Sequence, residues 1–285
     1  MHDSAILLVS CPDRKGVVAT IADFIYRNNG NILFADEHGD KESNLFLMRV
    51  EFDHSGLKFD IAEFGGRFAP IAAEFQMDWR LAHSTDRPRV VIFVSRYDHC
   101  LQDLLYRHQS GELRCEIPLI ISNHPDNQRI ADFYHVPYVV VPVTKDNKKE
   151  AEQKQLSLIR EHQCDLVVLA RYMQVLSTEF TSAIGTRNLI NIHHSFLPAF
   201  IGSRPYHQAF QRGVKLIGAT AHYVTEVLDD GPIIEQDVVR VSNRDTVEEL
   251  TEKGRDIEKV VLSRAVRWHV ENRILLYGNK TVVFQ

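Results

Sequence analysis

The sequence lacks several features that would define other classes of protein. None of its apolar runs approaches the roughly 20 residues that a transmembrane helix needs, so we expect no membrane partner. The N-terminal residues have neither the basic segment nor the longer apolar run of a secretory signal. The net charge is −5 and no basic tract occurs, which argues against a nucleic-acid partner. These absences favour an ordinary globular protein of the cytoplasm.

Cysteine and glycine are also missing from the patterns that they commonly form. The 4 cysteines are scattered and form no CxxC pair, so neither a zinc knuckle nor a redox couple is indicated. No GxGxxG follows a predicted strand, which excludes a dinucleotide-binding dehydrogenase. Tandem repeats and low-complexity segments are absent. What remains is a chain of 285 residues, long enough for one large or two modest domains.

The first 85 residues predict a ferredoxin-like domain of order βαββαβ. Apolar residues recur at helical spacing in 17–25 and 61–71, and strand-like segments surround them. These strands are expected at 5–9, 31–34, 45–52 and 76–81, with a hairpin at Gly39-Asp40. The polar segment 83–88 ends in Pro88 and is typical of a linker. We therefore expect one domain at 1–85 and a second at 86–285.

The second domain alternates buried strands with helices, which predicts a Rossmann-like, mainly parallel, doubly wound sheet. Its strands lack clean alternation, as expected where both faces of a sheet are covered. The strands are expected at 89–94, 117–122, 138–141, 166–169 and 189–192. The helices are expected at 101–108, 126–134, 148–162, 177–184 and 246–270, with a strand pair in 274–284.

Three polar side chains indicate a catalytic site at the edge of this sheet. Asn191 and His193 lie two positions apart at the end of a strand and so share one face, whereas His194 is expected to face the other way. Asp229 follows a second apolar strand, in an acidic loop closed by Gly231-Pro232. Ligands of open α/β sheets bind at the carboxyl ends of the strands. An amide, an imidazole and a carboxylate there can polarise a carbonyl and move a proton.

The motifs at 191–198 and 228–234 resemble those of the folate-dependent formyltransferase fold. The resemblance covers roughly residues 88–280, and two ordered motifs at this spacing are a strong signal. That family includes glycinamide ribonucleotide transformylase, methionyl-tRNA formyltransferase and formyltetrahydrofolate deformylase. Its transferases typically carry proline directly after the catalytic histidine, whereas this chain carries His194. The turn at 95–105 also lacks the glycines that cradle a phosphorylated acceptor, so the chain resembles the deformylase branch.

The resemblance implies a hydrolase that converts 10-formyltetrahydrofolate and water to formate and tetrahydrofolate. Such an enzyme supplies formate for purine synthesis and balances the one-carbon folate pools. The folate is the substrate, and no separate cofactor is expected. One alternative is formyl transfer to an amine, as in glycinamide ribonucleotide transformylase. Another is an amino-acid sensor that retains the large domain only to bind folate.

The same resemblance implies roles for individual residues. Asn191 and His193 would donate hydrogen bonds to the oxyanion, and Asp229 would hold and deprotonate the water, directly or through His193. The division of work between His193 and Asp229 stays open. Arg171 is also a candidate for contact with an anionic tail. The residues expected to bind the substrate are Leu169, Arg171, Tyr172, Met173, Val175, Val224, Val227 and Leu228.

Two further expectations concern the surroundings of this site. A metal held by His193, His194, His222 and Asp229 would lack the usual ligand spacing, so no metal is expected. His222 is interpreted as a core histidine with its hydrogen bonds satisfied. The loop at 196–207 is apolar enough to cover the site.

The segments 11–18 and 28–32 resemble the start of an ACT domain. ACT domains bind small effectors, often amino acids, or pair edge to edge in oligomers. In deformylases of this type, the implied effectors are methionine and glycine. The residues expected to bind an effector are Asp13, Arg14, Gly16 and Asn31. The alternative is a dimerisation module without a ligand, and in either case we expect a homo-oligomer.

Overall fold

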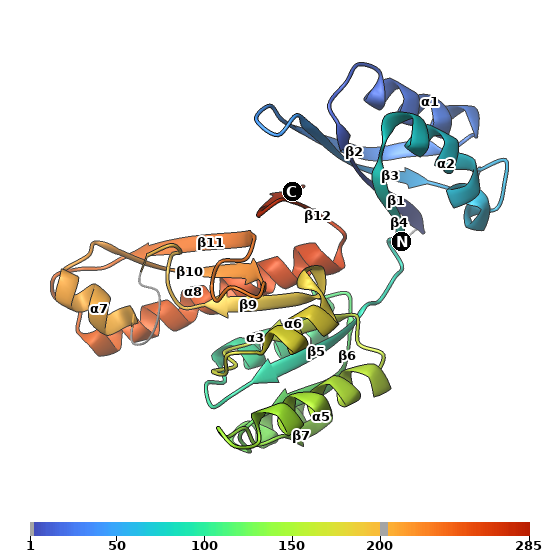
Figure 1. Cartoon of the computed structure of the whole chain (residues 1–285). Helices are drawn as coiled ribbons and strands as arrows, with labels where there is room; N and C mark the ends of the chain where they lie inside the picture. The colour runs from blue at the N-terminus through green and yellow to red at the C-terminus, as the bar shows by residue number, and fades with distance from the viewer. Residues whose placement is uncertain (1–2, 200–204) are drawn as a thin grey trace. The chain divides into compact units, whose positions relative to one another are not determined.

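The computed structural model describes residues 3–199 and 205–285 (Figure 1). The loop that was expected to cover the site includes residues 200–204, which lie outside this description. The chain forms two compact units. The first comprises residues 1–86, 271–275 and 282–285, and the second comprises residues 87–270 and 276–281. Within the described residues, no helix has the length and apolar character needed to cross a membrane.

The first unit is a four-stranded antiparallel sheet of order β2-β3-β1-β4. Its elements are β1 (Ser4–Pro12), α1 (Val17–Arg27), β2 (Asn31–Asp40), β3 (Leu45–Asp53), the 3-10 turn η1 (Ile61–Glu63), α2 (Phe64–Phe75) and β4 (Asp78–His83). This order confirms the predicted βαββαβ arrangement. The predicted hairpin position is corrected, because β2 continues through Asp40 and the turn occupies residues 41–44.

Alternation along the strands determines which face of this sheet packs on the helices. Ala5, Leu7 and Val9 lie in one buried cluster with apolar residues of α1 and α2. Within that cluster, Phe64 stacks on Phe68 with ring centroids 5.4 Å apart. The C-terminal residues of this unit also contact β3, since Arg49 Nε donates to the carbonyl of Asn272 over 3.0 Å. Whether residues 86–285 form one functional domain stays a prediction.

The second unit is a seven-stranded sheet of order β11-β10-β9-β8-β5-β6-β7. Neighbouring strands from β9 to β7 run parallel, and β10 and β11 are antiparallel additions at one edge. Its strands are β5 (Arg89–Val94), β6 (Glu116–Ser122), β7 (Tyr138–Val140), β8 (Leu166–Leu169), β9 (Leu189–His193), β10 (Leu216–Tyr223) and β11 (Ile233–Arg240). The mainly parallel fold expected from the sequence is confirmed.

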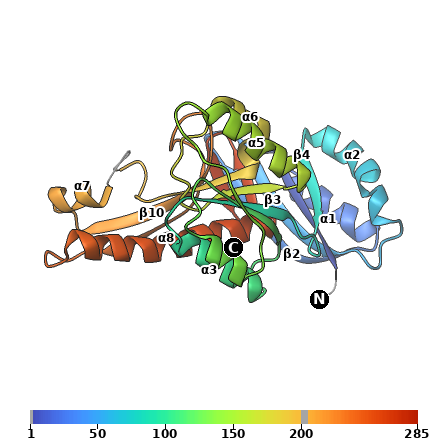
Figure 2. The same ribbon diagram turned by 90° about the horizontal axis from the view of Figure 1, so that it is seen from below.

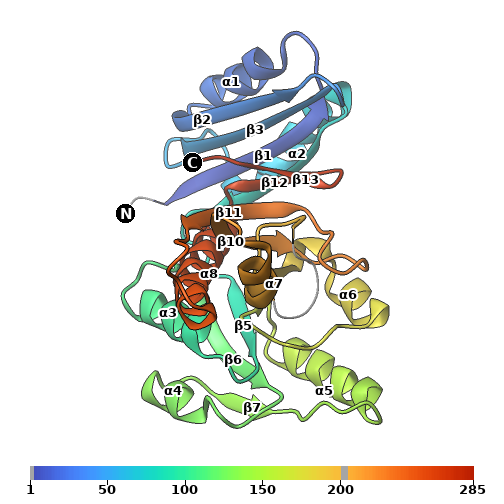
Figure 3. The ribbon, with the colours of Figure 1, turned by 90° about the vertical axis from the view of Figure 1, so that its left-hand side faces the viewer.

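Helices cover both faces of this sheet (Figure 3). They are α3 (His99–Gln109), α4 (Gln128–Phe133), α5 (Lys148–Glu161), α6 (Thr178–Ile184), α7 (Pro205–Arg212) and α8 (Val247–Val270), and η2 (Thr186–Asn188) is a 3-10 turn. Helix α8 packs along β10 and against α3 (Figure 2), while α5 contacts α6. A last hairpin follows, β12 (Ile274–Tyr277) and β13 (Lys280–Val283). The layers leave the carboxyl ends of β8 and β9 side by side.

Candidate active site

Strand register places the polar side chains of the neighbouring strands β9 and β10 together, next to β8. Asn191 of β9 is opposite Leu169 of β8 on one side and His222 of β10 on the other. Two residues further along β9, His193 is opposite Thr220 of β10. Because residues two apart share a face of a strand, Asn191 and His193 point the same way, as the sequence indicated. His222 shares this face because it is directly opposite Asn191 on β10.

A cavity of about 290 Å³ opens beside these residues. Its wall contains Asn191, His193 and Asp229, which the structure therefore brings together from two distant segments. It also contains seven of the residues expected to bind substrate: Leu169, Arg171, Tyr172, Met173, Val175, Val224 and Leu228. Val227 is the exception, because its side chain is 61% exposed and does not line the cavity within the described part of the chain.

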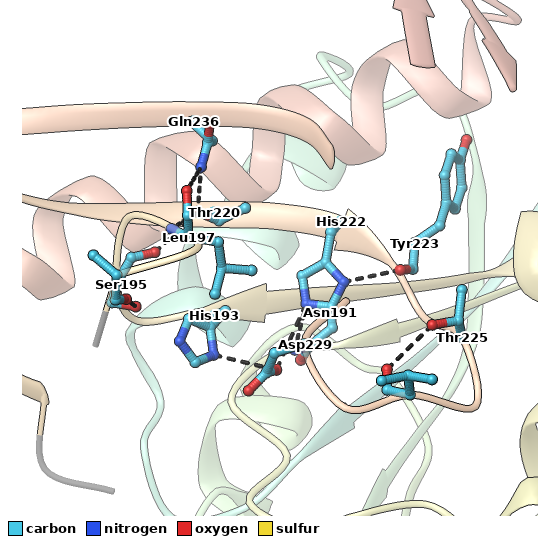
Figure 4. A network of polar contacts seen from close by, with 12 residues as sticks. Asn191, His193, Ser195, Leu197, Thr220, His222, Tyr223, Thr225, Asp229 and Gln236 are labelled. Carbon is cyan, nitrogen blue, oxygen red and sulfur yellow. Dashed lines mark hydrogen bonds and ion pairs between the residues drawn. The ribbon is translucent and has the colours of Figure 1, made fainter. Parts of the chain in front are cut away.

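His193 and Asp229 form the central pair of the site (Figure 4). Nδ1 of His193 lies 3.3 Å from Oδ1 of Asp229, and the two side chains are 5% and 9% exposed. Nε2 of His193 is buried and has no hydrogen-bond partner among the residues that the structure describes. The imidazole is thus held at one nitrogen and unpaired at the other, on the wall of the cavity.

The pKa of Asp229 lies below its usual value although the group is largely enclosed. Burial of the carboxyl raises its pKa, but the hydrogen bond from His193 and the charge attraction of His193 outweigh that effect. The carboxylate therefore stays ionised at neutral pH. An ionised carboxylate beside an imidazole is suited to orienting the ring and stabilising its protonated form.

His222 determines the orientation of the Asn191 amide. Nδ1 of His222 lies 2.8 Å from the carbonyl oxygen of Tyr223, so Nδ1 carries the proton and donates it there. Burial lowers the pKa of His222, which keeps the ring neutral and makes Nε2 an acceptor. The Nδ2 group of Asn191 then donates to Nε2 over 3.2 Å. The prediction that His222 is a satisfied core histidine is half right, because the ring is satisfied but also lines the cavity.

A second set of hydrogen bonds shapes the backbone around the site. Oγ1 of Thr220 donates to the carbonyl of Ser195 over 2.9 Å and accepts from the backbone N–H of Leu197 over 3.1 Å. Nε2 of Gln236 donates to the Leu197 carbonyl and to Thr220, as Figure 4 shows. These bonds fix the chain as it leaves β9 just beyond His193.

The loop that carries Asp229 depends on a glycine. A Cβ at Gly231 would lie 1.7 Å from the carbonyl oxygen of Tyr223, so no other residue fits without moving the backbone. Asp229 itself has a φ of 56°, in the left-handed region where aspartate is more readily accommodated than most residues. The loop therefore returns tightly onto β10 and brings the carboxylate toward His193.

His194 contradicts the expectation that it faces away from the site. It lies one residue past the end of β9 and is a lining residue of the same cavity, and its ring centroid is 5.2 Å from that of His193. Burial, followed by the positive charge of Arg171, lowers the pKa of His194 to about 3. His194 is therefore neutral at physiological pH, and strand alternation did not apply beyond the last strand residue.

Arg171 is held mainly by the protein itself. Its Nε lies 3.4 Å from Oε2 of the fully buried Glu258, and its guanidinium stacks over Tyr97 at 5.1 Å. Nη1 of Arg171 has no hydrogen-bond partner among the described residues. Tyr172 turns its hydroxyl into the core, where Nε2 of Gln155 donates to it over 2.8 Å. Arg171 and Tyr172 thus line the cavity, while Glu258, Tyr97 and Gln155 hold their polar groups.

Three of the expected effector residues, Asp13, Arg14 and Gly16, lie just before α1 in the first unit. Asn31 does not join them, because it pairs with Asp53 at the end of the sheet opposite to Pro12. Gly16 precedes the helix with a φ of 97°. Arg14 donates to the carbonyl of Glu74 and lies 4.2 Å from the centre of the Phe75 ring. Asp13 donates its backbone N–H to the carbonyl of Asn44, and Asn31 begins the edge strand β2. Whether these residues bind an effector stays a prediction.

The cavity has further lining residues that the sequence patterns do not indicate. Gln174, Leu176, Thr181, Thr225 and Glu226 also line it but were not among the expected site residues. These residues lie in turns or at helix starts, where no periodic pattern indicates the direction of a side chain. Only the proximity of Gln174 and Leu176 to the predicted segment 169–175 was available as a signal.

Comparison with known proteins agrees with this architecture. The family model for formyl transferase matches residues 88–266, and the ACT domain model matches residues 5–58. The fold and the matched segments define a protein of the formyl transferase fold with an N-terminal ACT domain. The chain belongs to the formyltetrahydrofolate deformylase family, as the relatives below show.

A formyltetrahydrofolate deformylase of Synechocystis sp. is 56% identical over 281 residues, which are 99% of this chain and 98% of the relative. The crystal structure of a formyltetrahydrofolate deformylase from Pseudomonas syringae pv. tomato has a TM-score of 0.97 at 50% identity and covers 100% of this chain and 95% of that one. Glycinamide ribonucleotide transformylase 1 from Symbiobacterium toebii is more distant, with a TM-score of 0.66 at 27% identity over 70% of this chain and 95% of that one.

Proposed function

We propose that this chain hydrolyses 10-formyltetrahydrofolate to formate and tetrahydrofolate. The observation that carries the proposal is the state of His193: Asp229 holds one ring nitrogen, and the other is unpaired on the cavity wall within the described residues. A nitrogen in that position can accept a proton from water and later return it. The names of the similar proteins support the same reaction.

The reaction needs help because water is a weak nucleophile and the formyl group is an amide. With Nδ1–H donated to Asp229, Nε2 of His193 accepts a proton as the water oxygen bonds to the formyl carbon. General base catalysis of this kind contributes about 10²- to 10⁴-fold. The carbonyl oxygen then carries the negative charge. When the C–N bond breaks, the proton on His193 passes to the departing nitrogen. The formic acid that is released then loses its remaining proton to solvent and becomes formate.

Asn191 is the proposed donor to that oxyanion. One N–H of its amide is committed to His222, and this bond fixes the amide so that the oxygen and nitrogen cannot exchange places. The second N–H is then available to the developing charge. One such donor is typically worth about 3 kcal/mol of the barrier. His222 acts here only by positioning Asn191.

The cavity is suited to a flat heteroaromatic ring. Its apolar wall includes Leu169, Val175, Val224 and Leu228. Ligand pockets usually combine such a wall with a few polar groups that fix orientation. The proposal places the pterin against these residues, with its formyl group toward His193.

Incubation with 10-formyltetrahydrofolate and no amine tests this function. We expect formate and tetrahydrofolate to appear in equal amounts over many turnovers. Formate that appears only in traces, together with formylation of glycinamide ribonucleotide when it is added, would contradict the proposal and establish the transferase alternative. One structural observation already weighs against the transferase: Tyr97 occupies the turn after β5 and lies against Arg171 and Arg255.

For the ACT unit, we propose amino-acid control of the same reaction. Methionine and glycine are the effectors to test, by adding each to the formate assay. We also propose a homo-oligomer, because β2 is an edge strand with Leu33 and Phe34 exposed. Light scattering of the purified chain distinguishes an oligomer from a monomer.

A further inference from the structure

Three metal-ligating side chains meet at one end of the first unit's sheet. Strand β1 lies between β3 and β4 and runs antiparallel to both. The register pairs Ser4 with Asp53 and Ala5 with His83. The start of β1 and the ends of β3 and β4 therefore lie side by side at the same end of the sheet. Asp3, just before β1, comes to lie between His54, just after β3, and His83, the last residue of β4.

The distances between these side chains suit a metal better than a hydrogen bond. Oδ2 of Asp3 lies 3.4 Å from Nε2 of His54 and 4.0 Å from Nδ1 of His83. Both distances exceed those of an ordinary N–H···O hydrogen bond, about 2.7–3.2 Å. All three ligand atoms lie within 4.8 Å of one another. Around a tetrahedral Zn²⁺ with bonds of about 2.0–2.1 Å, ligand atoms are separated by roughly 3.4 Å.

One nitrogen in this group is left unsatisfied. Nε2 of His54 is buried, and no described residue forms a hydrogen bond with it. A buried nitrogen without a partner destabilises a fold, typically by about 1–3 kcal/mol. A metal ion in front of the nitrogen would remove that cost. The His54 side chain as a whole is 17% exposed, so the site lies near the surface.

A hydrogen bond to one oxygen of the Asp3 carboxylate leaves the other oxygen toward the two imidazoles. Oγ1 of Thr85 donates to its Oδ1 over 3.0 Å, which leaves Oδ2 directed at the two imidazoles. The backbone N–H of Ser4 donates to Oγ of Ser84 over 2.9 Å and fixes the start of β1. Hydrogen bonds of this kind commonly support the first ligands of metal sites.

We propose that Asp3, His54 and His83 bind a divalent transition metal of the zinc type, with water as the fourth ligand. Two histidines and one carboxylate are a donor set that Zn²⁺ and its neighbours accept. The metal would join the ends of three strands in the ACT unit. The site is separate from the catalytic residues, which belong to the other unit.

Metal binding to the tag-free full chain tests this site. After removal of metal by a chelator, the chain is titrated with Co²⁺, whose absorption spectrum reports a tetrahedral site, and with Zn²⁺ in competition. We expect one equivalent to bind and Zn²⁺ to raise the melting temperature. His54→Gln and His83→Gln should each weaken binding at least about tenfold, in line with the loss of a ligand.

His38→Gln is the matched control, because His38 is an exposed histidine of β2 in the same unit. It should bind as the unchanged chain does. Circular dichroism and acceptor-free formate release show whether the His54 and His83 variants are folded. Absence of Co²⁺ or Zn²⁺ binding by the unchanged chain would overturn the proposal. Equal binding by folded His54→Gln and His83→Gln variants would overturn it as well.

Discussion

Two histidine–carboxylate pairs in the second unit use the same chemistry in different surroundings. His193 and Asp229 are 3.3 Å apart on the wall of the cavity, and Nε2 of His193 has no partner among the described residues. His99 and Glu258 are 2.7 Å apart, and Glu258 is fully buried. Glu258 also accepts from the hydroxyl of Tyr206 over 2.5 Å and pairs with Arg171.

The difference shows that a histidine–carboxylate pair is not by itself a catalytic signature. Burial raises the pKa of Glu258, but the hydrogen bond from His99, the charge of Arg171 and that of His99, and Tyr206 together lower it, so the carboxylate is ionised and fully used. The pair at Asp229 keeps one nitrogen unpaired at a cavity. The place of His193 and Asp229 on the cavity wall is what distinguishes the proposed catalytic pair from the structural one.

The largest effect is expected from removal of the unpaired imidazole. His193→Ala should lower kcat for formate release by about 10⁴-fold, because both the proton acceptor and the later donor are lost. Steady-state formate release measures this, with the exposed His38→Ala as a control that should leave kcat unchanged. A loss of less than tenfold in His193→Ala would mean that the two pairs do not differ as proposed.

The buried pair should affect stability instead. Glu258→Gln leaves the charge of Arg171 uncompensated in the interior, which typically costs about 3–5 kcal/mol. Urea denaturation should show this loss in the free energy of unfolding. Glu248→Gln, at an exposed position of the same helix, should change it by less than about 0.5 kcal/mol. Equal unfolding free energies for the two variants would show that the buried pair is not structural.

Asn191→Ala should lower kcat less than His193→Ala does. It removes the proposed oxyanion donor and should lower kcat by about 10²-fold, with a smaller change in KM. Pre-steady-state formate release separates the chemical step from binding. If kcat changes by less than about threefold, then Asn191 is not the oxyanion donor.

The smallest effect concerns the pH dependence of stability at His194. Its pKa is about 3 in the folded chain, whereas the ordinary value is 6.5. Between these values the unfolded chain binds a proton that the folded chain does not. The free energy of unfolding therefore falls as the pH drops below 6.5, by up to about 1.4 kcal/mol per pH unit. Urea denaturation at pH 6 and pH 4.5 should show a shallower fall in His194→Gln, and parallel curves would contradict this account.

Much of the fold was predictable because its signals are periodic. The buried runs of β5, β6, β8 and β9 and the helical patterns between them determine the parallel sheet, and the Asn191–His193 spacing determines one shared face. The grouping of the C-terminal residues with the first unit was not predictable. A predicted strand pair at 274–284 does not indicate which part of the chain it packs against. Residues 271–275 and 282–285 in fact group with the first unit.

The candidate site was predictable where strands carry it and less so where loops do. Val227 is exposed, contrary to the prediction. Its direction was not predictable because the loop at 225–230 has no repeating pattern. His194 faces the cavity because the strand ends at His193. His222 belongs to the site because it pairs with Asn191 across two strands. That register was not predictable, because it is set by long-range packing and not by neighbouring residues.

The most direct test of the account is the formate released by Asp229→Asn from 10-formyltetrahydrofolate without any amine. The substitution keeps the shape of the side chain but removes the negative charge next to His193. The account predicts a fall in kcat of about 10³-fold, while the dissociation constant of tetrahydrofolate changes by less than about threefold. Turnover near that of the unchanged chain would contradict it.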